Sequence, residues 1–172
     1  MKNVLRNLKW IAAVVVNMAF VGTPLDVMAG GCTNFTSITS GNWSSTSTWC
    51  NGNIPGASDN TIIATGHTVT VNGTFSCASL TLGTGNGTAN LTFSGLNPQL
   101  TVTNTVNVGG PNNDNRSGSI TFTNGSTLIA NLINLNQNDG GSGSSIIMTN
   151  GGHIKTAAIG TLRTALSPTW TP

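Results

Sequence analysis

Carboxylates are the groups most able to do chemistry in this chain, and they are few. Beyond Ala29 only Asp59, Asp114 and Asp139 remain, and there is no Glu. Glycoside hydrolysis needs two carboxyl groups at a defined separation. Asp59 follows the Pro55-Gly56 turn, where we expect its carboxylate to accept backbone hydrogen bonds. Because no Ser-His-Asp arrangement stands out either, we expect no catalytic residues and predict that the protein is not an enzyme.

The other two carboxylates belong to polar loops centred on Asn113-Asp114 and Asn138-Asp139. Carboxylate and amide oxygens from flexible loops are the ligands that Ca²⁺ prefers. The dense Asp repeat typical of calcium-binding solenoids is missing, however. We therefore expect solvated loops that need no cofactor and no metal, with calcium as the alternative. If the protein has a ligand-facing edge, these two loops are the candidates for it.

The segment from Met1 to Ala29 has the order of parts of a secretory signal peptide. Three cations precede an apolar run over 10–22, and 27–29 supplies small or apolar residues before Gly30. The run is shorter than the roughly 20 residues of a membrane-spanning helix, so a signal peptide is favoured over a membrane anchor. We expect a secreted or cell-surface protein, without a membrane span after cleavage.

The remaining chain is uncharged overall. Beyond Ala29 the positive charges of Arg116, Lys155 and Arg163 equal in number the negative charges of the three Asp residues. Nucleic-acid binding requires clustered Lys and Arg, so no nucleic-acid partner is expected. Only 6% of all residues are charged, and Gly, Asn, Ser and Thr fill the gap, which favours turns and strands over helix interiors.

Three cysteines lie beyond the leader, at Cys32, Cys50 and Cys77. Export makes one disulfide an expectation, and three pairings are open. We expect Cys50 to pair with Cys77, which would fasten the loop that contains Cys50 to the strands that follow it and leave Cys32 free. Lipidation of Cys32 is an alternative. No zinc site is expected, because His67 and His153 form no tight cluster with these cysteines. His67 follows Gly66 at a turn, where a structural hydrogen bond is expected.

Short strands and a longer repeat organise the mature chain. Apolar residues alternate with polar ones over 67–71, 79–82, 91–93, 100–102, 106–108 and 120–122, which indicates half-buried strands. Six positions then recur at one constant offset, pairing Ile120 with Ile146, Phe122 with Met148, Asn124 with Asn150, Gly125 with Gly151, Leu128 with Ile154 and Ile133 with Ile159. A repeat of this size predicts a stacked solenoid; an antiparallel sandwich is the alternative, since Asn-Gly also marks hairpins.

The segment from Ser40 to Val71 resembles the lead-in of β-helical surface proteins secreted by Bacteroidetes-type bacteria, and is similar to the G8 domain of animal extracellular proteins. The similarity rests on the residues that follow one another in a set order, namely Ser40-Gly41-Asn42-Trp43-Ser44, Thr48-Trp49, Gly52, Pro55, Asp59 and Gly66-His67. It implies a right-handed parallel β-helix whose first coil this segment caps. An open solenoid end must be covered, and Trp43 and Trp49 are large enough to cover it.

These expectations divide the chain into a signal peptide (1–29), an N-terminal cap (30–60), β-helix coils (61–160) and an irregular end that reads as truncated (161–172). We expect a non-catalytic structural or adhesive segment of a surface protein, with a surface polysaccharide or another extracellular protein as partner. The alternatives are a carbohydrate-binding module using Trp43, Trp49 or Trp170, the N-terminal part of a polysaccharide-degrading enzyme, and ice binding through Thr68, Thr70, Thr101 and Thr103.

Overall fold

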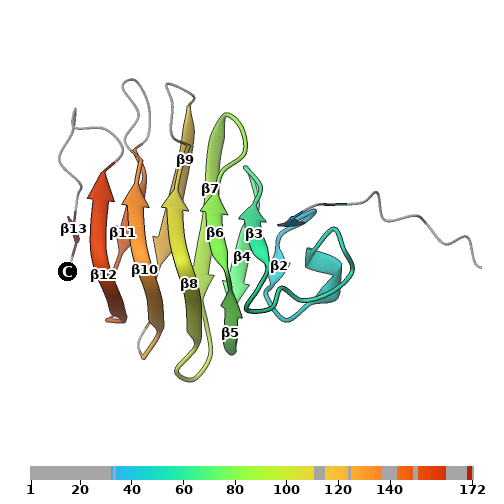
Figure 1. Cartoon of the computed structure of the whole chain (residues 1–172), viewed down its shortest axis with the longest axis horizontal. Coiled ribbons are helices and arrows are strands. Elements are labelled where there is room, and N and C mark those ends of the chain that lie inside the picture. Colours follow the sequence, from blue (N-terminus) through green and yellow to red (C-terminus); the bar gives the residue numbers. More distant parts are fainter. Residues whose placement is uncertain are drawn as a thin grey trace, which may run out of the picture.

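The structure is a computed structural model that describes residues 32, 34–110, 115–123, 125–136, 143–148, 151–161 and 170–171. The predicted signal peptide lies outside these residues. The described part is all-β apart from the 3₁₀ turn η1 (Thr46–Thr48) (Figure 1). It contains no helix with the length and apolarity of a membrane span. The strands are β1 (Phe35–Thr36), β2 (Gly41–Asn42), β3 (Asn60–Ile63), β4 (Thr68–Val71), β5 (Thr74–Cys77), β6 (Ser79–Leu82), β7 (Gly87–Phe93), β8 (Gln99–Val108), β9 (Arg116–Thr121), β10 (Thr127–Leu135), β11 (Ser145–Ile147), β12 (His153–Thr161) and β13 (Trp170–Thr171).

The strands form two parallel sheets that wind around one core. One sheet has the order β1-β3-β6-β8-β10-β12, with β5 also pairing with β8, and the other has the order β2-β4-β7-β9-β11-β13. Every ladder between these strands is parallel. Parallel neighbours that are far apart in sequence are what stacked coils produce and hairpins do not. The all-β parallel solenoid is therefore confirmed, and the antiparallel sandwich is excluded.

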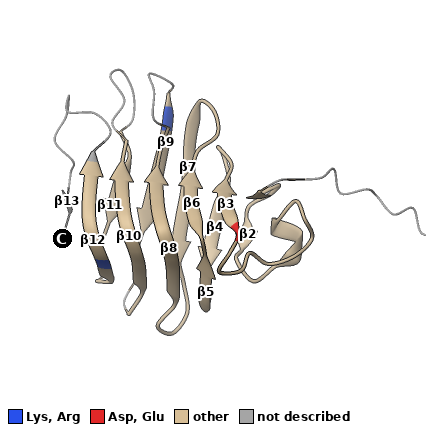
Figure 2. Ribbon diagram, viewed as in Figure 1, with Lys and Arg blue, Asp and Glu red and all other residues tan. Residues whose placement is uncertain are grey.

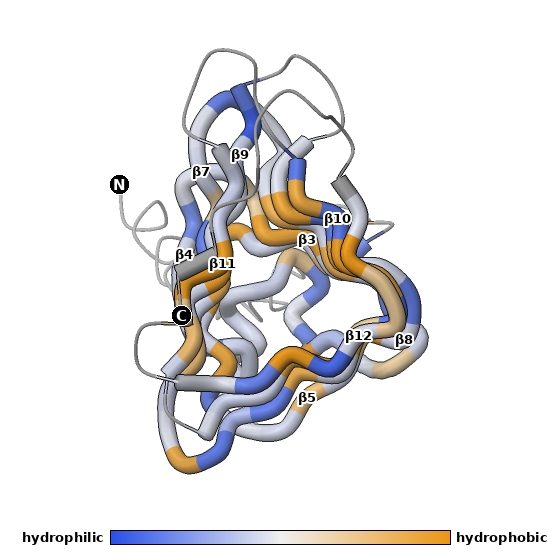
Figure 3. Tube along the Cα trace, turned by 90° about the vertical axis from the view of Figure 1, so that its left-hand side faces the viewer, coloured by the Kyte–Doolittle hydropathy of each residue, from blue (hydrophilic) through white to orange (hydrophobic). Residues whose placement is uncertain are grey.

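Each coil has three sides, because the long strands bend (Figure 3). Face 1 consists of β1, β3, β6 and the second halves of β8, β10 and β12, and face 2 is the six-stranded sheet. Face 3 consists of β5 and the first halves of β8, β10 and β12. In β8 the bend carries one extra residue, since the register shifts between Ala130 and Leu132 of its partner β10.

The core consists of columns of inward side chains, one from each coil. Leu91 pairs with Ile120, and Ile120 with Ile146, on face 2. Leu100 pairs with Leu128, and Leu128 with Ile154, on face 3. The rings of Phe93 and Phe122 stack with centroids 4.9 Å apart. The constant offset predicted from the repeat is thus the register of the ladders.

Glycine turns the corners between faces 2 and 3. Gly125 and Gly151 have φ values of 75° and 85°, a region that glycine enters without the steric cost of a Cβ. The repeat predicted that these two glycines occupy equivalent positions in successive coils. They also share a backbone conformation, because both have a positive, left-handed φ.

Candidate functional site

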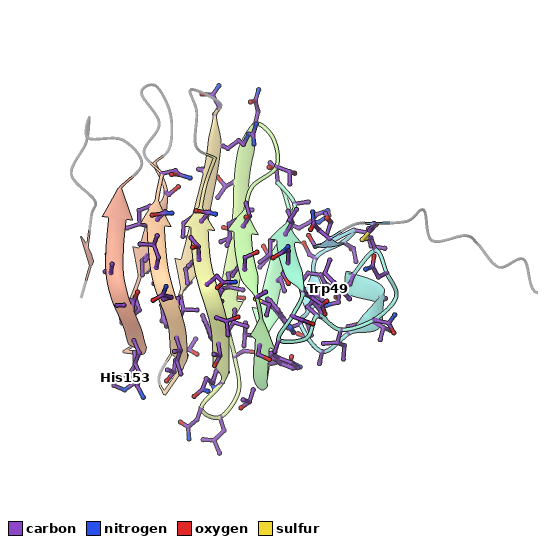
Figure 4. All side chains as sticks on the ribbon, in the orientation of Figure 1. Trp49 and His153 are labelled. Carbon is purple, nitrogen blue, oxygen red and sulfur yellow. A yellow bond between two sulfur atoms is a disulfide. The ribbon has the colours of Figure 1, made fainter. Side chains whose placement is uncertain are left out.

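Two tryptophans form a lid at the N-terminal end of the solenoid. Trp43 and Trp49 have exposed fractions of 0% and 1%. Their rings meet edge to face with centroids 5.0 Å apart at 67°, and Trp43 also stacks on Phe75 of β5 at 6.2 Å. Trp49 Nε1 donates a 2.9 Å hydrogen bond to the Trp43 carbonyl. Figure 4 shows Trp49 at the end of the molecule opposite to β12 and His153. Neither ring offers a free face to a ligand.

The backbone around the lid covers the sheet edges of the first coil. β1 pairs with β3, and β2 pairs with β4. Trp43 N–H donates to Thr70 O at 2.8 Å, and Ser37 N–H donates to Ile62 O at 2.9 Å. An isolated antiparallel bridge joins Ser37 to Trp49. Edge strands that would otherwise template pairing with other chains are thereby occupied.

Pro55 and Asp59 lie in the turn that leads into β3. Pro55 is buried. Asp59 Oδ2 accepts a 2.8 Å hydrogen bond from Gly56 N–H, and Asp59 N–H donates to Gly56 O at 3.0 Å. The carboxylate of Asp59 is therefore used inside its own turn.

His67 is held by a serine from the lid. Ser37 Oγ accepts from Ala64 N–H at 2.9 Å and lies 2.9 Å from His67 Nδ1. Because the Ser37 hydroxyl accepts the hydrogen bond from Ala64, its own proton is available to His67. Ser37 is 2% exposed, so this Ser-His pair fastens β1 to the first coil and leaves no accessible nucleophile.

The disulfide joins Cys32 to Cys50, with their Cα atoms 6.4 Å apart. The predicted Cys50–Cys77 pairing is therefore wrong. Cys77 is the free cysteine and is buried, because it lies on the inward side of β5 and pairs with Val102 of the next coil. The sequence contains a signal for this burial in Phe75, Ser76 and Cys77. Residues two apart in a strand point to the same side, so Cys77 points inward like Phe75, which packs against the core.

Burial raises the pKa of the Cys77 thiol from 9.0 to about 12. Desolvation is the main cause; the Thr61 side chain opposes it, and Asp59 adds to it. A thiolate is the nucleophilic and metal-binding form of cysteine. Cys77 is therefore a core side chain and not a reactive group.

The predicted ligand-facing residues Asn113, Asp114, Asn138 and Asp139 lie outside the described residues, so the calcium alternative stays a prediction. Their neighbour Asn136 is described and is 3% exposed. Its backbone N–H donates to Val108 O at 3.0 Å and its side chain donates to Gly109 O. Asn136 therefore closes a corner between two coils.

Charged groups are sparse over the part of the chain that the structure describes. Asp59 lies in the lead-in, Arg116 begins β9 and Lys155 lies on β12, and the charged residues in Figure 2 are well separated. Within these same residues, no three His, Cys or acidic side chains lie together as a metal site would require. No described cluster of titratable groups thus has the make-up of an active site.

The outward side of face 2 carries an ordered set of hydroxyl and amide groups that the sequence alone did not align. We call it the hydroxyl–amide face. Its central row follows the ladder register of face 2, and its flanking rows lie two residues to either side. The central row is Asn42, Thr70, Thr92, Thr121 and Ile147; the flanking rows are Ser40, Thr68, Asn90, Ser119 and Ser145, and Ser44, Asn72 and Ser94.

The threonines predicted for ice binding do not lie on one face. Thr68 and Thr70 belong to the hydroxyl–amide face. Thr101 lies on face 3, and Thr103 lies at the bend of β8, where its hydroxyl donates to Cys77 O at 3.2 Å. The four residues therefore cannot act as one surface.

No protein-family model, curated protein or solved structure matches this chain. The fold and the surface groups are therefore the basis for its function.

Proposed function

We propose that this chain is a non-catalytic, adhesive and structural β-helix segment of an exported bacterial surface protein. One observation carries the proposal: three of the groups that the sequence offers for chemistry, all within the described residues, are used to hold the fold. Asp59 binds Gly56 N–H, His67 binds Ser37, and Cys77 is buried. The signal-like leader and the resemblance of the lead-in to secreted β-helical surface proteins support export.

A rigid solenoid suits a display role. Stacked coils present their outward side chains at fixed spacing, and each coil is stabilised by its neighbours. The lid tryptophans are excluded as sugar-stacking platforms by their burial, so adhesion would use the coil faces or the polar loops.

Incubation of the full chain with particulate and soluble polysaccharides tests this proposal. We expect adsorption to particles or to bacterial cells, with no new reducing ends and no unsaturated sugar products. Heat-denatured protein is the control for non-specific adsorption. Product that increases with protein concentration would show an enzyme and overturn the proposal.

A further inference from the structure

We propose that the hydroxyl–amide face binds an extended, neutral, β-linked polysaccharide whose chain lies along the central row. This inference rests on the adhesive function proposed above and names its partner class. It is carried by the alignment, the hydrogen bonding and the charge of the residues on this one face.

The side chains of the face are preorganised by bonds between coils. Thr70 Oγ1 and Thr92 Oγ1 are 3.0 Å apart, and Ser145 Oγ donates to Ser119 Oγ at 3.1 Å. Asn72, on the neighbouring coil, donates to Ser44 Oγ at 2.8 Å. Groups already held in one conformation lose little entropy when a ligand binds.

These groups keep capacity for a ligand. A hydroxyl has one donor and two acceptor sites, so one bond within the row leaves the others free. All members of the face are exposed or half-buried, while the residues between them on the same strands, such as Val69, Leu91 and Ile120, are fully buried. The face therefore presents donors and acceptors together, as the hydroxyls of a sugar require.

The spacing of the central row selects an extended chain. Neighbouring strands lie about 4.8 Å apart, a distance close to the length of one pyranose in an extended β-linked polymer. The row crosses five strands, which gives it a length of about 19 Å. Its threonine and isoleucine methyl groups offer apolar contact to the C–H groups of a sugar ring, and the flanking rows offer hydrogen bonds to the ring's edges.

The charge of the face selects a neutral polymer. None of its members is ionisable. Among the described strands of the six-stranded sheet the charged residue is Arg116, at the first position of β9, about 10 Å along the strand from Ser119. Anionic glycans would find no matching row of cations, and binding to neutral ones should depend little on salt.

The other faces fit this ligand less well. On face 1, one outward row contains the apolar pair Leu132 and Ala158 side by side, and face 3 carries Ile129 and the charged Lys155 side by side. The mixed Ser, Asn and Thr composition of the hydroxyl–amide face also favours a polysaccharide over an ice lattice, which requires repeated identical groups.

Adsorption of the full chain to particulate cellulose and chitin tests the inference. The test variant is Thr70→Val, Thr92→Val and Thr121→Val, which keeps side-chain shape and removes three hydroxyls. The matched control is Thr81→Val, Thr101→Val and Thr127→Val, which makes three such changes on faces 1 and 3. Circular dichroism melting establishes that each variant is folded, and Thr92→Arg serves as a second, blocking variant if the triple variant is not.

We expect cellulose or chitin binding to weaken at least about tenfold in the test variant and to stay unchanged in the control and at raised salt. Unchanged binding in the test variant would overturn the site and leave the adhesive function standing. Binding to polygalacturonate alone, binding to none of these polymers, or thermal hysteresis in place of cellulose and chitin binding would overturn the inference. Release of soluble sugar would instead overturn the proposed function.

Discussion

Replacing Trp49 by alanine should open the N-terminal lid and lower the free energy of unfolding by about 3–5 kcal/mol. The side chain is 1% exposed. Its edge-to-face contact with Trp43, at 5.0 Å, accounts for about 0.5–1.5 kcal/mol of this. The buried hydrogen bond from its Nε1 to Trp43 O, at 2.9 Å, accounts for about 0.5–1.5 kcal/mol more. Loss of burial and the cavity left behind make up the rest.

Urea unfolding followed by far-ultraviolet circular dichroism measures this loss without relying on tryptophan fluorescence. Trp49→Phe keeps a ring but leaves the Trp43 carbonyl without its donor, so about 1–3 kcal/mol is expected. Leu96→Ala is the control, because Leu96 is 93% exposed and should change stability by no more than about 0.5 kcal/mol. Hydrogen exchange should quicken first in β1, β3 and β5, since coils contact only their neighbours.

Equal stability of Trp49→Ala and Leu96→Ala would refute the lid. A Trp49→Ala variant with native stability but lost polysaccharide adsorption would likewise refute the lid and show that the ring is a ligand platform.

Three further predictions concern the lid, the core and strand β9. Reduction of Cys32–Cys50, or Cys50→Ser, should cost roughly 3 kcal/mol for a loop of this size, the sequence separation being 18; equal urea midpoints with and without reductant would contradict this. Cys77 should resist alkylation until the protein unfolds. The contribution of its thiol to the free energy of unfolding should be complete below pH 9.0 and decline towards about pH 12, because the thiol of the unfolded chain ionises first. Cys77→Ala should remove this dependence of the urea midpoint on pH. Gly118→Ala should destabilise by about 1–3 kcal/mol or more, since its Cβ would lie 2.8 Å from Gly109 N, whereas Gly85→Ala meets nothing within 4 Å and should be nearly neutral in thermal melts.

Much of the fold could be predicted because every coil of a solenoid has to satisfy the same packing and backbone-pairing requirements. Every coil must place apolar residues at the same inward positions, so the constant offset from Ile120 to Ile146 and from Leu128 to Ile154 in the sequence is also the ladder register. Alternation with period two distinguishes inward from outward side chains within each strand. The alternation is local and the offset is constant, so both patterns are visible in the sequence before any contact between coils is known.

The partners of particular residues could not be predicted in this way. Which cysteine lies near Cys50 depends on how the lead-in folds back across the coil end, and that path brings Cys32 to a Cα distance of 6.4 Å while β5 turns Cys77 inward. The hydroxyl–amide face depends on coil lengths that differ early in the chain, since Thr70 pairs with Thr92 and Thr92 with Thr121 across unequal separations in sequence.

The amino-acid sequence by itself thus determined that this protein is a parallel solenoid with stacked apolar columns, because burial and backbone pairing impose the same pattern on every coil. The sequence also predicted that Trp43 and Trp49 cover the first coil, and in the structure both rings are buried. The tertiary structure alone decided that the disulfide joins Cys32 to Cys50 and that the threonines of β4, β7 and β9 share one face. Those features arise from contacts between segments whose separation along the chain is irregular, so only the path of the backbone brings them together.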